Sequence, residues 1–342
     1  MTTVAFTTAY GMGPLPRMLE RACGAAALER VFRAESIPLW LAQNQNERLP
    51  LRSLMGLLER AAREMGDHQF GLNLGMEMNP EDYGPVGRYI GTAPTLLEMI
   101  MRSGRAVPYH ASRCKFGLLV ADGLAYWQFC NYDSFTIGRR HQADHVIPPA
   151  LQGMRRFLGP SWLPLRLEVE YDRPPNWRTL EEWIGVPVVY GAIANAFVFD
   201  EALLYNTPHR EIPAKEAMTW RELRQFAQRR PPRTHVEAAR EVLRMRLFDA
   251  SVDIDGTAKL LGIASRTLQR QLAEENLTYR DLVQQLRMQR AADLLRESAE
   301  PVTSIAYALG YSDLASFTRA FRQWTGRPPS HYRRDAPSVS AL

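Results

Sequence analysis

Two short segments in the last hundred residues combine arginine, glutamine and hydroxyl side chains with an absence of acids. Residues 263–273 contain Arg266, Gln269 and Arg270, and residues 314–327 contain three arginines; neither segment contains an Asp or Glu. Arginine can donate two hydrogen bonds to O6 and N7 of guanine, and glutamine pairs in a similar way with N6 and N7 of adenine. An acid-free surface also suits a groove lined by phosphates. These segments therefore predict nucleic-acid binding.

The two segments belong to copies of one pattern, offset by 48 to 49 residues. The matching positions are Ala258, Leu261, Gly262, Ile263, Leu268, Arg270 and Leu272 in the first copy and Ala306, Leu309, Gly310, Tyr311, Phe317, Arg319 and Phe321 in the second. A helix-turn-helix needs a small residue where its helices cross, a glycine for the left-handed turn, and an apolar pair that holds the second helix on the core. The repeat therefore predicts two helix-turn-helix units whose second helices enter the major groove.

The second helix of each unit carries the predicted DNA contacts. We expect Arg266, Gln269 and Arg270 to reach base edges, and serine and threonine hydroxyls to bond phosphates and so to set the register. The predicted DNA-binding residues are Ser265, Arg266, Thr267, Gln269, Arg270, Asp313, Leu314, Ala315, Ser316, Thr318, Arg319 and Arg322.

A long amphipathic stretch, Tyr279 to Arg296, separates the two copies and predicts one connecting helix. At 1.5 Å per residue such a helix is roughly 27 Å long. It would let the two units enter successive major grooves on one face of the duplex, about 34 Å apart.

These residues resemble the AraC/XylS family of transcriptional regulators. The segment from Ile305 to Arg333, IAYALGYSDLASFTRAFRQWTGRPPSHYR, resembles the family's C-terminal signature along nearly its whole length, and SRTLQRQL at Ser265 to Leu272 is a weaker match. The resemblance implies a bacterial regulator that binds a double-stranded DNA operator and acts on RNA polymerase. It also implies that the second helix of the first helix-turn-helix unit, its recognition helix, makes most of the contacts to bases. Because Leu314 and Ala315 are apolar, contact with thymine methyl groups is the alternative to hydrogen bonding there.

The first two hundred residues mix helix and strand patterns. Helical spacing runs through Ser53 to Met65 and again from Leu96 to Met101. Two apolar runs, Phe116–Ala121 and Leu124–Cys130, flank Asp122-Gly123, a pair typical of a tight hairpin turn. Further strands are expected at Leu165–Tyr171, Pro187–Tyr190 and Phe197–Phe199.

Prolines and charged residues between Thr207 and Arg233 indicate a domain boundary, since a helix cannot continue through Pro231-Pro232. The predicted domains are residues 1–206 for ligand sensing, 207–233 as a linker, 234–335 for the double helix-turn-helix, and 336–342 as a tail. The predicted fold is an α+β N-terminal sensor domain followed by an all-α C-terminal domain with two helix-turn-helix units joined by a long helix.

The front domain has a looser resemblance of its own. Trp162-Leu163-Pro164-Leu165 before a strand, and Asn195 to Asp200, resemble the sensor domain of ornithine- and arginine-utilisation-type regulators of the same family, over residues about 15 to 205. The resemblance implies a small-molecule effector and leaves a homodimer open. A pocket for an effector is mostly apolar with a few polar groups. The candidate ligand-binding residues, each of which has core packing as its alternative, are Arg88, Tyr109, His110, Tyr126, Trp127 and Phe129.

Two residue pairs leave an enzyme or metal sensor, fused to a DNA-binding tail, as the alternative function. His110 and Cys114, and likewise His141 and His145, are spaced by one helical turn, which suits metal ligands or a nucleophile. The second pair lacks the glutamate of the HExxH motif, and the chain has no glycine-rich phosphate loop and no GxSxG motif. We therefore expect no catalytic residue, metal or cofactor.

Composition is compatible with this interpretation without establishing it. The net charge of +5 permits a polyanionic partner. Three cysteines without a CxxC pair favour reduced thiols and a cytoplasmic location. No apolar stretch reaches the roughly 18 residues that a membrane span needs, so we expect no membrane association.

Overall fold

The computed structural model describes residues 4–132, 136–209, 217–226, 232–247 and 252–334. The described residues between Ala5 and Pro231 form one compact unit, the N-terminal unit, and those from Pro232 onward form a second, the C-terminal unit. Among these residues no helix is both long and apolar enough to cross a membrane. Each unit is described by itself.

The N-terminal unit contains both helices and strands, as predicted. Its helices are α1 (Leu15–Cys23), α2 (Ala25–Ala34), α3 (Leu51–Met65), α4 (Phe70–Met76), α5 (Gly84–Gly91), α6 (Leu96–His110), α7 (Arg139–Asp144), α8 (Ile147–Leu158), α9 (Arg178–Ile184) and α10 (Trp220–Phe226). Its strands are β1 (Phe6–Thr8), β2 (Arg48–Pro50), β3 (Cys114–Ala121), β4 (Leu124–Asn131), β5 (Arg166–Val169), β6 (Val188–Tyr190) and β7 (Asn195–Asp200). Short 3₁₀ helices include η1 (Ala9–Met12) and η3 (Pro80–Tyr83).

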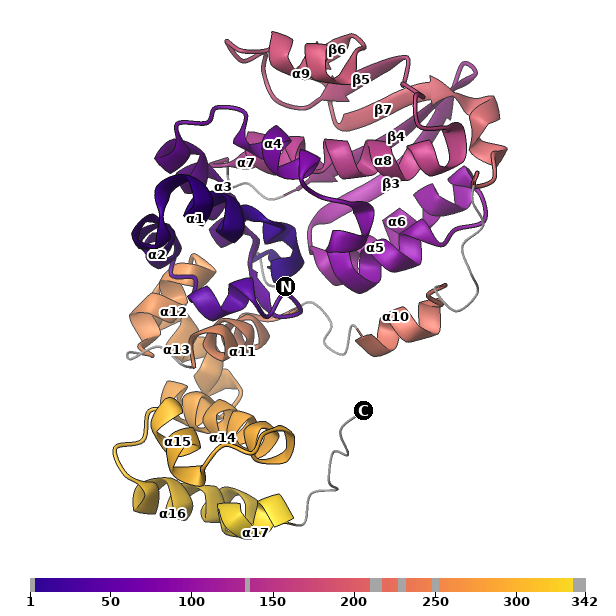
Figure 1. The fold of residues 1–342 in the computed structure, drawn as a ribbon. Coiled ribbons are helices and arrows are strands. Elements are labelled where there is room, and N and C mark those ends of the chain that lie inside the picture. Colours follow the sequence, from indigo (N-terminus) through magenta and orange to yellow (C-terminus); the bar gives the residue numbers. More distant parts are fainter. Residues whose placement is uncertain (1–3, 133–135, 210–216, 227–231, 248–251, 335–342) are drawn as a thin grey trace. The chain divides into compact units, whose positions relative to one another are not determined.

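Five strands form one sheet in the order β3-β4-β7-β5-β6, in which only β5 and β6 are parallel (Figure 1). The hairpin predicted at Asp122-Gly123 is confirmed: β3 pairs with β4 in antiparallel register, Ala121 opposite Leu124. Asp122 and Gly123 have φ of 52° and 76°, the left-handed values that a two-residue hairpin turn requires. Strand β5, Arg166–Val169, is shorter than the predicted Leu165–Tyr171 at both ends.

The core of this unit lies between the sheet and helices α6, α8 and α9. Strand β4 alternates along its length, so that Ala125, Trp127 and Phe129 are buried while the residues between them are partly exposed. Because successive side chains of a strand point to opposite faces, only one face of β4 reaches this core. The strand therefore presents Trp127 to helix α6, whose Ser103 Oγ lies 3.3 Å from the indole nitrogen.

Helix α10 lies within the segment predicted as a linker and was not predicted. Leu223 of this helix is fully buried in a cluster with Val86, Tyr89 and Ala106 of the N-terminal unit. Its first turn is capped by Thr219, whose hydroxyl accepts from Glu222 N at 3.2 Å. The Thr-x-x-Glu spacing is a helix-start signal, but seven residues are too few to show a helical period.

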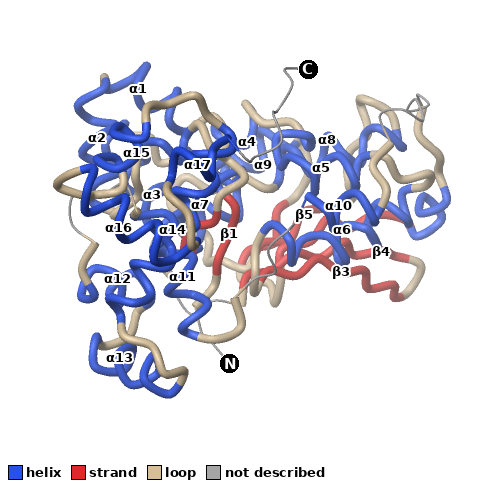
Figure 2. The backbone as a smooth tube through the Cα atoms, turned by 90° about the horizontal axis from the view of Figure 1, so that it is seen from below, coloured by secondary structure: helices blue, strands red, loops and turns tan. Residues whose placement is uncertain are grey.

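The described part of the C-terminal unit contains helices and their connecting segments but no strand (Figure 2). These are α11 (His235–Arg246), α12 (Ile254–Leu261), α13 (Ser265–Glu274), α14 (Tyr279–Glu297), α15 (Val302–Ala308), α16 (Leu314–Thr325) and α17 (Pro329–Arg334). The long helix predicted over Tyr279 to Arg296 is confirmed as α14, which packs against α11 and also against α15, α16 and α17. It therefore contributes to the core of the second helix-turn-helix unit, and its Tyr279 hydroxyl lies 2.8 Å from the Thr257 hydroxyl of α12.

Candidate nucleic-acid interface and ligand cavity

The first helix-turn-helix unit consists of α12 and α13, and its geometry follows the predicted pattern. Ala258 is buried at the crossing of the helices, and Gly262 has φ 68° and ψ 28°, the left-handed conformation that ends α12. Leu268 and Leu272 are fully buried on one side of α13. The predicted roles of the alanine, the glycine and the apolar pair are confirmed.

The second unit, α15 and α16, repeats this arrangement with aromatic residues. Gly310 has φ 82°, and Ala306, Phe317 and Phe321 are fully buried. Helix α16 starts four residues after Gly310, whereas α13 starts three residues after Gly262. This longer turn explains why the offset of the repeat grows from 48 to 49 residues.

The side of α13 opposite its buried leucines carries three of the predicted DNA-binding residues. Arg266, Gln269 and Arg270 are exposed, and the guanidinium of Arg270 lies 3.9 Å from the carboxylate of Glu274. Both side chains of this pair are about 70% exposed, so water and salt screen the pair and it holds Arg270 only weakly. These three side chains are free to turn toward a DNA groove.

The remaining polar residues at the start of α13 are less available. The Ser265 hydroxyl donates to the carboxylate of Asp255 on α12, and Thr267 is half-buried. Ser265 thus fixes α13 against α12 in the described structure, in addition to its predicted phosphate contact.

The start of α16 is organised by a helix cap. The Asp313 carboxylate accepts from Ser316 N at 2.7 Å and from Ser316 Oγ at 2.8 Å. The backbone N–H of Ser316 holds the pKa of Asp313 below its usual value, so this residue is a carboxylate that caps the helix. Arg319 Nη2 in turn donates to Ser316 Oγ at 3.1 Å.

Beyond the cap, α16 exposes a mixture of apolar and basic side chains. Leu314, Ala315, Arg319 and Arg322 are exposed, and Thr318 is half-buried. The first turn of α16 therefore exposes two apolar side chains, Leu314 and Ala315, where the first turn of α13 exposes Arg266.

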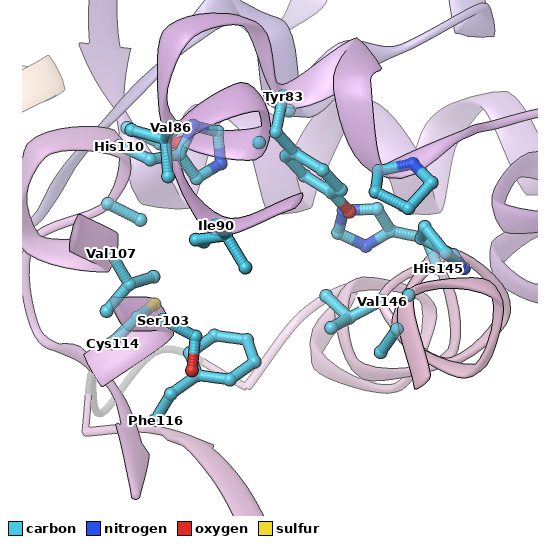
Figure 3. Close-up of a pocket in the computed structure, with 18 of the residues that line it drawn as sticks. Tyr83, Val86, Ile90, Ser103, Val107, His110, Cys114, Phe116, His145 and Val146 are labelled. Carbon is cyan, nitrogen blue, oxygen red and sulfur yellow. The ribbon is translucent and has the colours of Figure 1, made fainter. Parts of the chain in front are cut away.

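The N-terminal unit contains a partly open cavity of about 120 Å³ (Figure 3). Residues from η1, η3, α3, α5, α6, β3, β4 and α8 line it, and most of them are apolar. Tyr83, His110 and His145 project toward its interior among valines, Ile90 and Phe116 (Figure 3). A largely apolar hollow with a few polar groups is the usual form of a small-molecule site.

Two of the six predicted ligand-binding residues, His110 and Trp127, line this cavity. Phe129 lies in the core, stacked on Phe116 at 5.6 Å between ring centroids. Tyr126 lies on the opposite face of β4, because neighbouring residues of a strand alternate, and its hydroxyl accepts from Arg166 at 3.3 Å.

The other two candidates lie beside α10. Tyr109 packs against Trp220 with ring centroids 5.4 Å apart, and the Arg88 guanidinium lies 5.8 Å from the ring of Phe226. Tyr109 and Phe226 also line an outer groove, which shares Tyr83 and Val86 with the cavity. The six candidates therefore do not form one site.

Most of the cavity was not predicted from the sequence, including Tyr83, Val86, Ile90 and Val107. Tyr83 ends η3, Val86 and Ile90 lie on α5, and Val107 lies on α6. Each has the residue type and spacing of an ordinary core position. Only the folded arrangement brings them together, so the sequence held no signal for this group.

The cavity is electrically neutral at cellular pH. Burial lowers the pKa of His110 to about 3 and that of His145 to about 4, which leaves both imidazoles uncharged. Burial raises the pKa of Tyr83 well above its usual value. No Asp, Glu, Lys or Arg is among the described residues that line the cavity.

The paired histidines and the thiol have different surroundings in this structure. His141 Nδ1 accepts from Gly71 N at 3.2 Å, which joins α7 to α4. Cys114 lines the cavity with His110, and none of the three cysteines is in a disulfide. Within the described residues no group of three or more His, Cys, Asp or Glu side chains is arranged to hold a metal ion.

The fold and these sites define a helix-turn-helix protein with an α+β ligand-binding domain in front. A family model described as the arabinose-binding N-terminal domain of the AraC transcription regulator matches residues 26–207, more than half of the chain. A helix-turn-helix domain model matches residues 257–335. The chain belongs to the AraC family of transcription regulators, and the predicted resemblance is confirmed.

Individual relatives agree with this assignment. The chain is 26% identical to the HTH-type transcriptional regulator VirS of Mycobacterium tuberculosis over 327 residues, which cover 92% of this chain and 93% of VirS. It is 48% identical over 77 residues to the HTH-type transcriptional regulator VqsM of Pseudomonas aeruginosa, covering 22% of this chain and 24% of VqsM. The ornithine utilization regulator of the same organism is 38% identical over 85 residues, 25% of each chain. The last two matches span about a quarter of those relatives.

Proposed function

We propose that this protein is a sequence-specific DNA-binding regulator that reads its operator mainly with α13 and responds to a small-molecule effector bound in the cavity of the N-terminal unit. One observation carries the DNA-reading role. Arg266, Gln269 and Arg270 are exposed on α13, while Leu268 and Leu272 anchor the opposite side of that helix. An exposed row of bidentate donors on a rigidly held helix is what base recognition in the major groove requires.

Helix α16 has a supporting role in this proposal. Arg319 contacts a base edge or a phosphate, Arg322 contacts a phosphate, and Leu314 and Ala315 meet thymine methyl groups. Asp313 acts through the cap that fixes the start of α16, and Ser316 and Thr318 contribute hydroxyls near the backbone of the DNA. The common helix α14 sets the spacing of the two reading helices.

The effector acts by binding one conformation of the protein more tightly than another. A ligand shifts an equilibrium only by the difference in its affinities for the two states. We propose that the regulator has no catalytic reaction of its own, works in the cytoplasm where its operator lies, and acts on bacterial RNA polymerase. We further propose that it functions as a homodimer.

Replacing Arg270 with alanine tests the reading role of α13. We expect the variant to lose about 1–3 kcal/mol of binding free energy at one base position of the operator, because a bidentate contact to a base discriminates by that amount. The measurement is the affinity of the full chain for the selected operator and for a set of single-base variants. A uniform loss on all sequences would show that Arg270 contacts only phosphates.

Arg322→Ala is the matched control. This arginine is also exposed, but lies on α16 near its C-terminal end. We expect its loss to weaken all sequences by a similar factor and to reduce the salt dependence of binding by about one phosphate contact.

A further inference from the structure

We infer that the cavity of the N-terminal unit binds a small uncharged molecule with an apolar body and one hydrogen-bonding group, such as a cyclic or aromatic alcohol or ketone, and not a sugar or an amino acid. The inference rests on the proposed effector site and names the chemical class of its ligand. Three features of the cavity lead to it: its walls, one unpaired hydroxyl, and the absence of charge.

The walls favour an apolar body. Side chains from α5 (Val86 and Ile90), α6 (Val107) and β3 (Phe116), and from Val146 just before α8, face the interior (Figure 3). Burying apolar ligand surface against such walls is favourable in proportion to the area removed from water. At about 120 Å³ the cavity is on the scale of the engineered hollows that hold benzene. The occupant is therefore a compact molecule of about six to ten non-hydrogen atoms.

The Tyr83 hydroxyl supplies the polar contact. Its oxygen is buried and has no hydrogen-bond partner among the described residues. The ring is held edge-on against His110, with centroids 5.2 Å apart, and lies 6.3 Å from the ring of His145. A buried hydroxyl without a partner is costly, so a ligand that bonds to it recovers that free energy.

Ser103 and His110, two further polar groups of the wall, are already engaged, whereas His145 Nδ1, like the Tyr83 hydroxyl, is buried without a partner among the described residues. Ser103 Oγ donates to Ile100 O at 2.6 Å and lies within hydrogen-bond distance of the Trp127 indole nitrogen. His110 Nδ1 shares a hydrogen bond of 2.7 Å with Thr8 Oγ1. A pentose, whose several hydroxyls each need a partner, would leave most of them unsatisfied here.

Charge argues against an amino acid or a carboxylic acid. The described lining contains no Asp, Glu, Lys or Arg, and both histidines are neutral because burial lowers the pKa of each. A buried ion without a counter-charge is strongly disfavoured. The structure therefore selects against ornithine, arginine and other ions in this cavity.

The test compares probes of one shape and different polarity on the purified full chain in the absence of DNA. Benzyl alcohol, toluene, benzoate and benzylamine share a ring and differ in the group attached to it, and L-arabinose and L-ornithine represent the excluded classes. Titration calorimetry measures each affinity at probe concentrations up to the millimolar range. We expect benzyl alcohol to bind most tightly and toluene next, and we expect benzoate, benzylamine, L-arabinose and L-ornithine each to bind at least ten-fold more weakly than benzyl alcohol.

Two variants assign this binding to the cavity. Tyr83→Phe removes only the hydroxyl, so we expect it to weaken benzyl alcohol about 2- to 12-fold, the effect of one hydrogen bond, and to leave toluene unchanged. Tyr126→Phe is the control, because it removes a hydroxyl from the opposite face of β4. Val107→Phe fills part of the cavity and should abolish binding of both probes. Thermal melts check that each variant is folded.

The proposal is overturned if no probe binds, if benzoate, L-ornithine or L-arabinose binds more tightly than benzyl alcohol, or if Tyr83→Phe weakens toluene as much as benzyl alcohol. DNA affinity with and without each probe tests the effector role separately. A charged probe that changes DNA affinity would overturn the ligand class and leave the effector role intact. Neutral probes that bind the cavity without changing DNA affinity would support the ligand class and count against the effector role.

Discussion

Replacing Phe317 with alanine is expected to destabilise the second helix-turn-helix unit by about 3–5 kcal/mol, the cost of removing a fully buried aromatic side chain. Phe317 has no exposed surface and packs against Tyr311 at 5.3 Å and Phe321 at 5.7 Å between ring centroids. The cavity left behind cannot close, because α14 and α15 hold the other walls. Hydrogen exchange of peptides from α14–α17 in the full chain should accelerate by about two to four powers of ten.

Tyr307→Ala serves as the control for this variant. Tyr307 lies on α15 of the same unit, but its side chain is 56% exposed, so its loss should change stability by no more than about 0.5 kcal/mol. Equal acceleration of exchange in the two variants would contradict the assignment of Phe317 to the core that supports α16.

Lowering the pH from 7.5 to 5 is expected to reduce the free energy of unfolding of the N-terminal unit by about 2–3 kcal/mol. The folded-state pKa values of His110 and His145, about 3 and about 4, lie below the unfolded value of 6.5. The unfolded chain therefore binds more protons than the folded chain, and stability is lost as the pH falls below about 6.5. Before the opposing effect of Asp144 is counted, each of these two histidines lowers the free energy of unfolding by about 2 kcal/mol at pH 5.

Asp144 opposes part of this effect. Burial raises its pKa to about 6, from 3.8 in the unfolded chain, although Tyr171 and Arg140 bond to it. The folded state therefore takes up a proton at Asp144 as the pH falls through 6, and this returns about 1–1.5 kcal/mol of stability at pH 5.

Denaturant unfolding at a series of pH values measures the net effect. His145→Gln should remove most of the loss between pH 7.5 and 5, whereas the same replacement at the exposed His209 should not alter the slope. A slope unchanged by His145→Gln would mean that this imidazole is not held neutral by burial.

The helix-turn-helix units could be predicted because their determinants are local. Gly262 and Gly310 are needed for one backbone conformation each, and the apolar pairs lie one helical turn apart, so the pattern of a few residues specifies the motif. The hairpin at Asp122-Gly123 was predictable for the same reason. In these places the local signal and the tertiary structure agree.

The cavity could not be predicted because no local pattern defines it. Tyr83 and Val107 are separated in the chain and line one cavity only because α5 packs against both η3 and α6. The predicted aromatic residues near the hairpin alternate between the two faces of β4: Trp127 lines the cavity, whereas Tyr126 lies on the other face. The residue types alone do not show on which face of the strand each side chain lies.

Some chosen DNA-binding residues also have structural roles that spacing did not reveal. Asp313 is one of the predicted DNA-binding residues, and in the structure its carboxylate caps the start of α16. Ser265 was selected as a phosphate contact, and the structure also bonds it to Asp255. Short polar side chains at a helix start commonly have such roles, because they satisfy backbone groups there.

The most direct test of the account is selection of a randomised duplex library by the full chain at near-physiological salt, followed by sequencing of the retained DNA. The account predicts enrichment of one asymmetric site with two blocks about ten base pairs apart, the spacing of successive major grooves. It also predicts that Arg270→Ala relaxes one position in the block that α13 reads. The selection is carried out with the N-terminal unit folded and with benzyl alcohol present. If the chain then retains DNA but enriches no sequence, base recognition by α13 and α16 is contradicted.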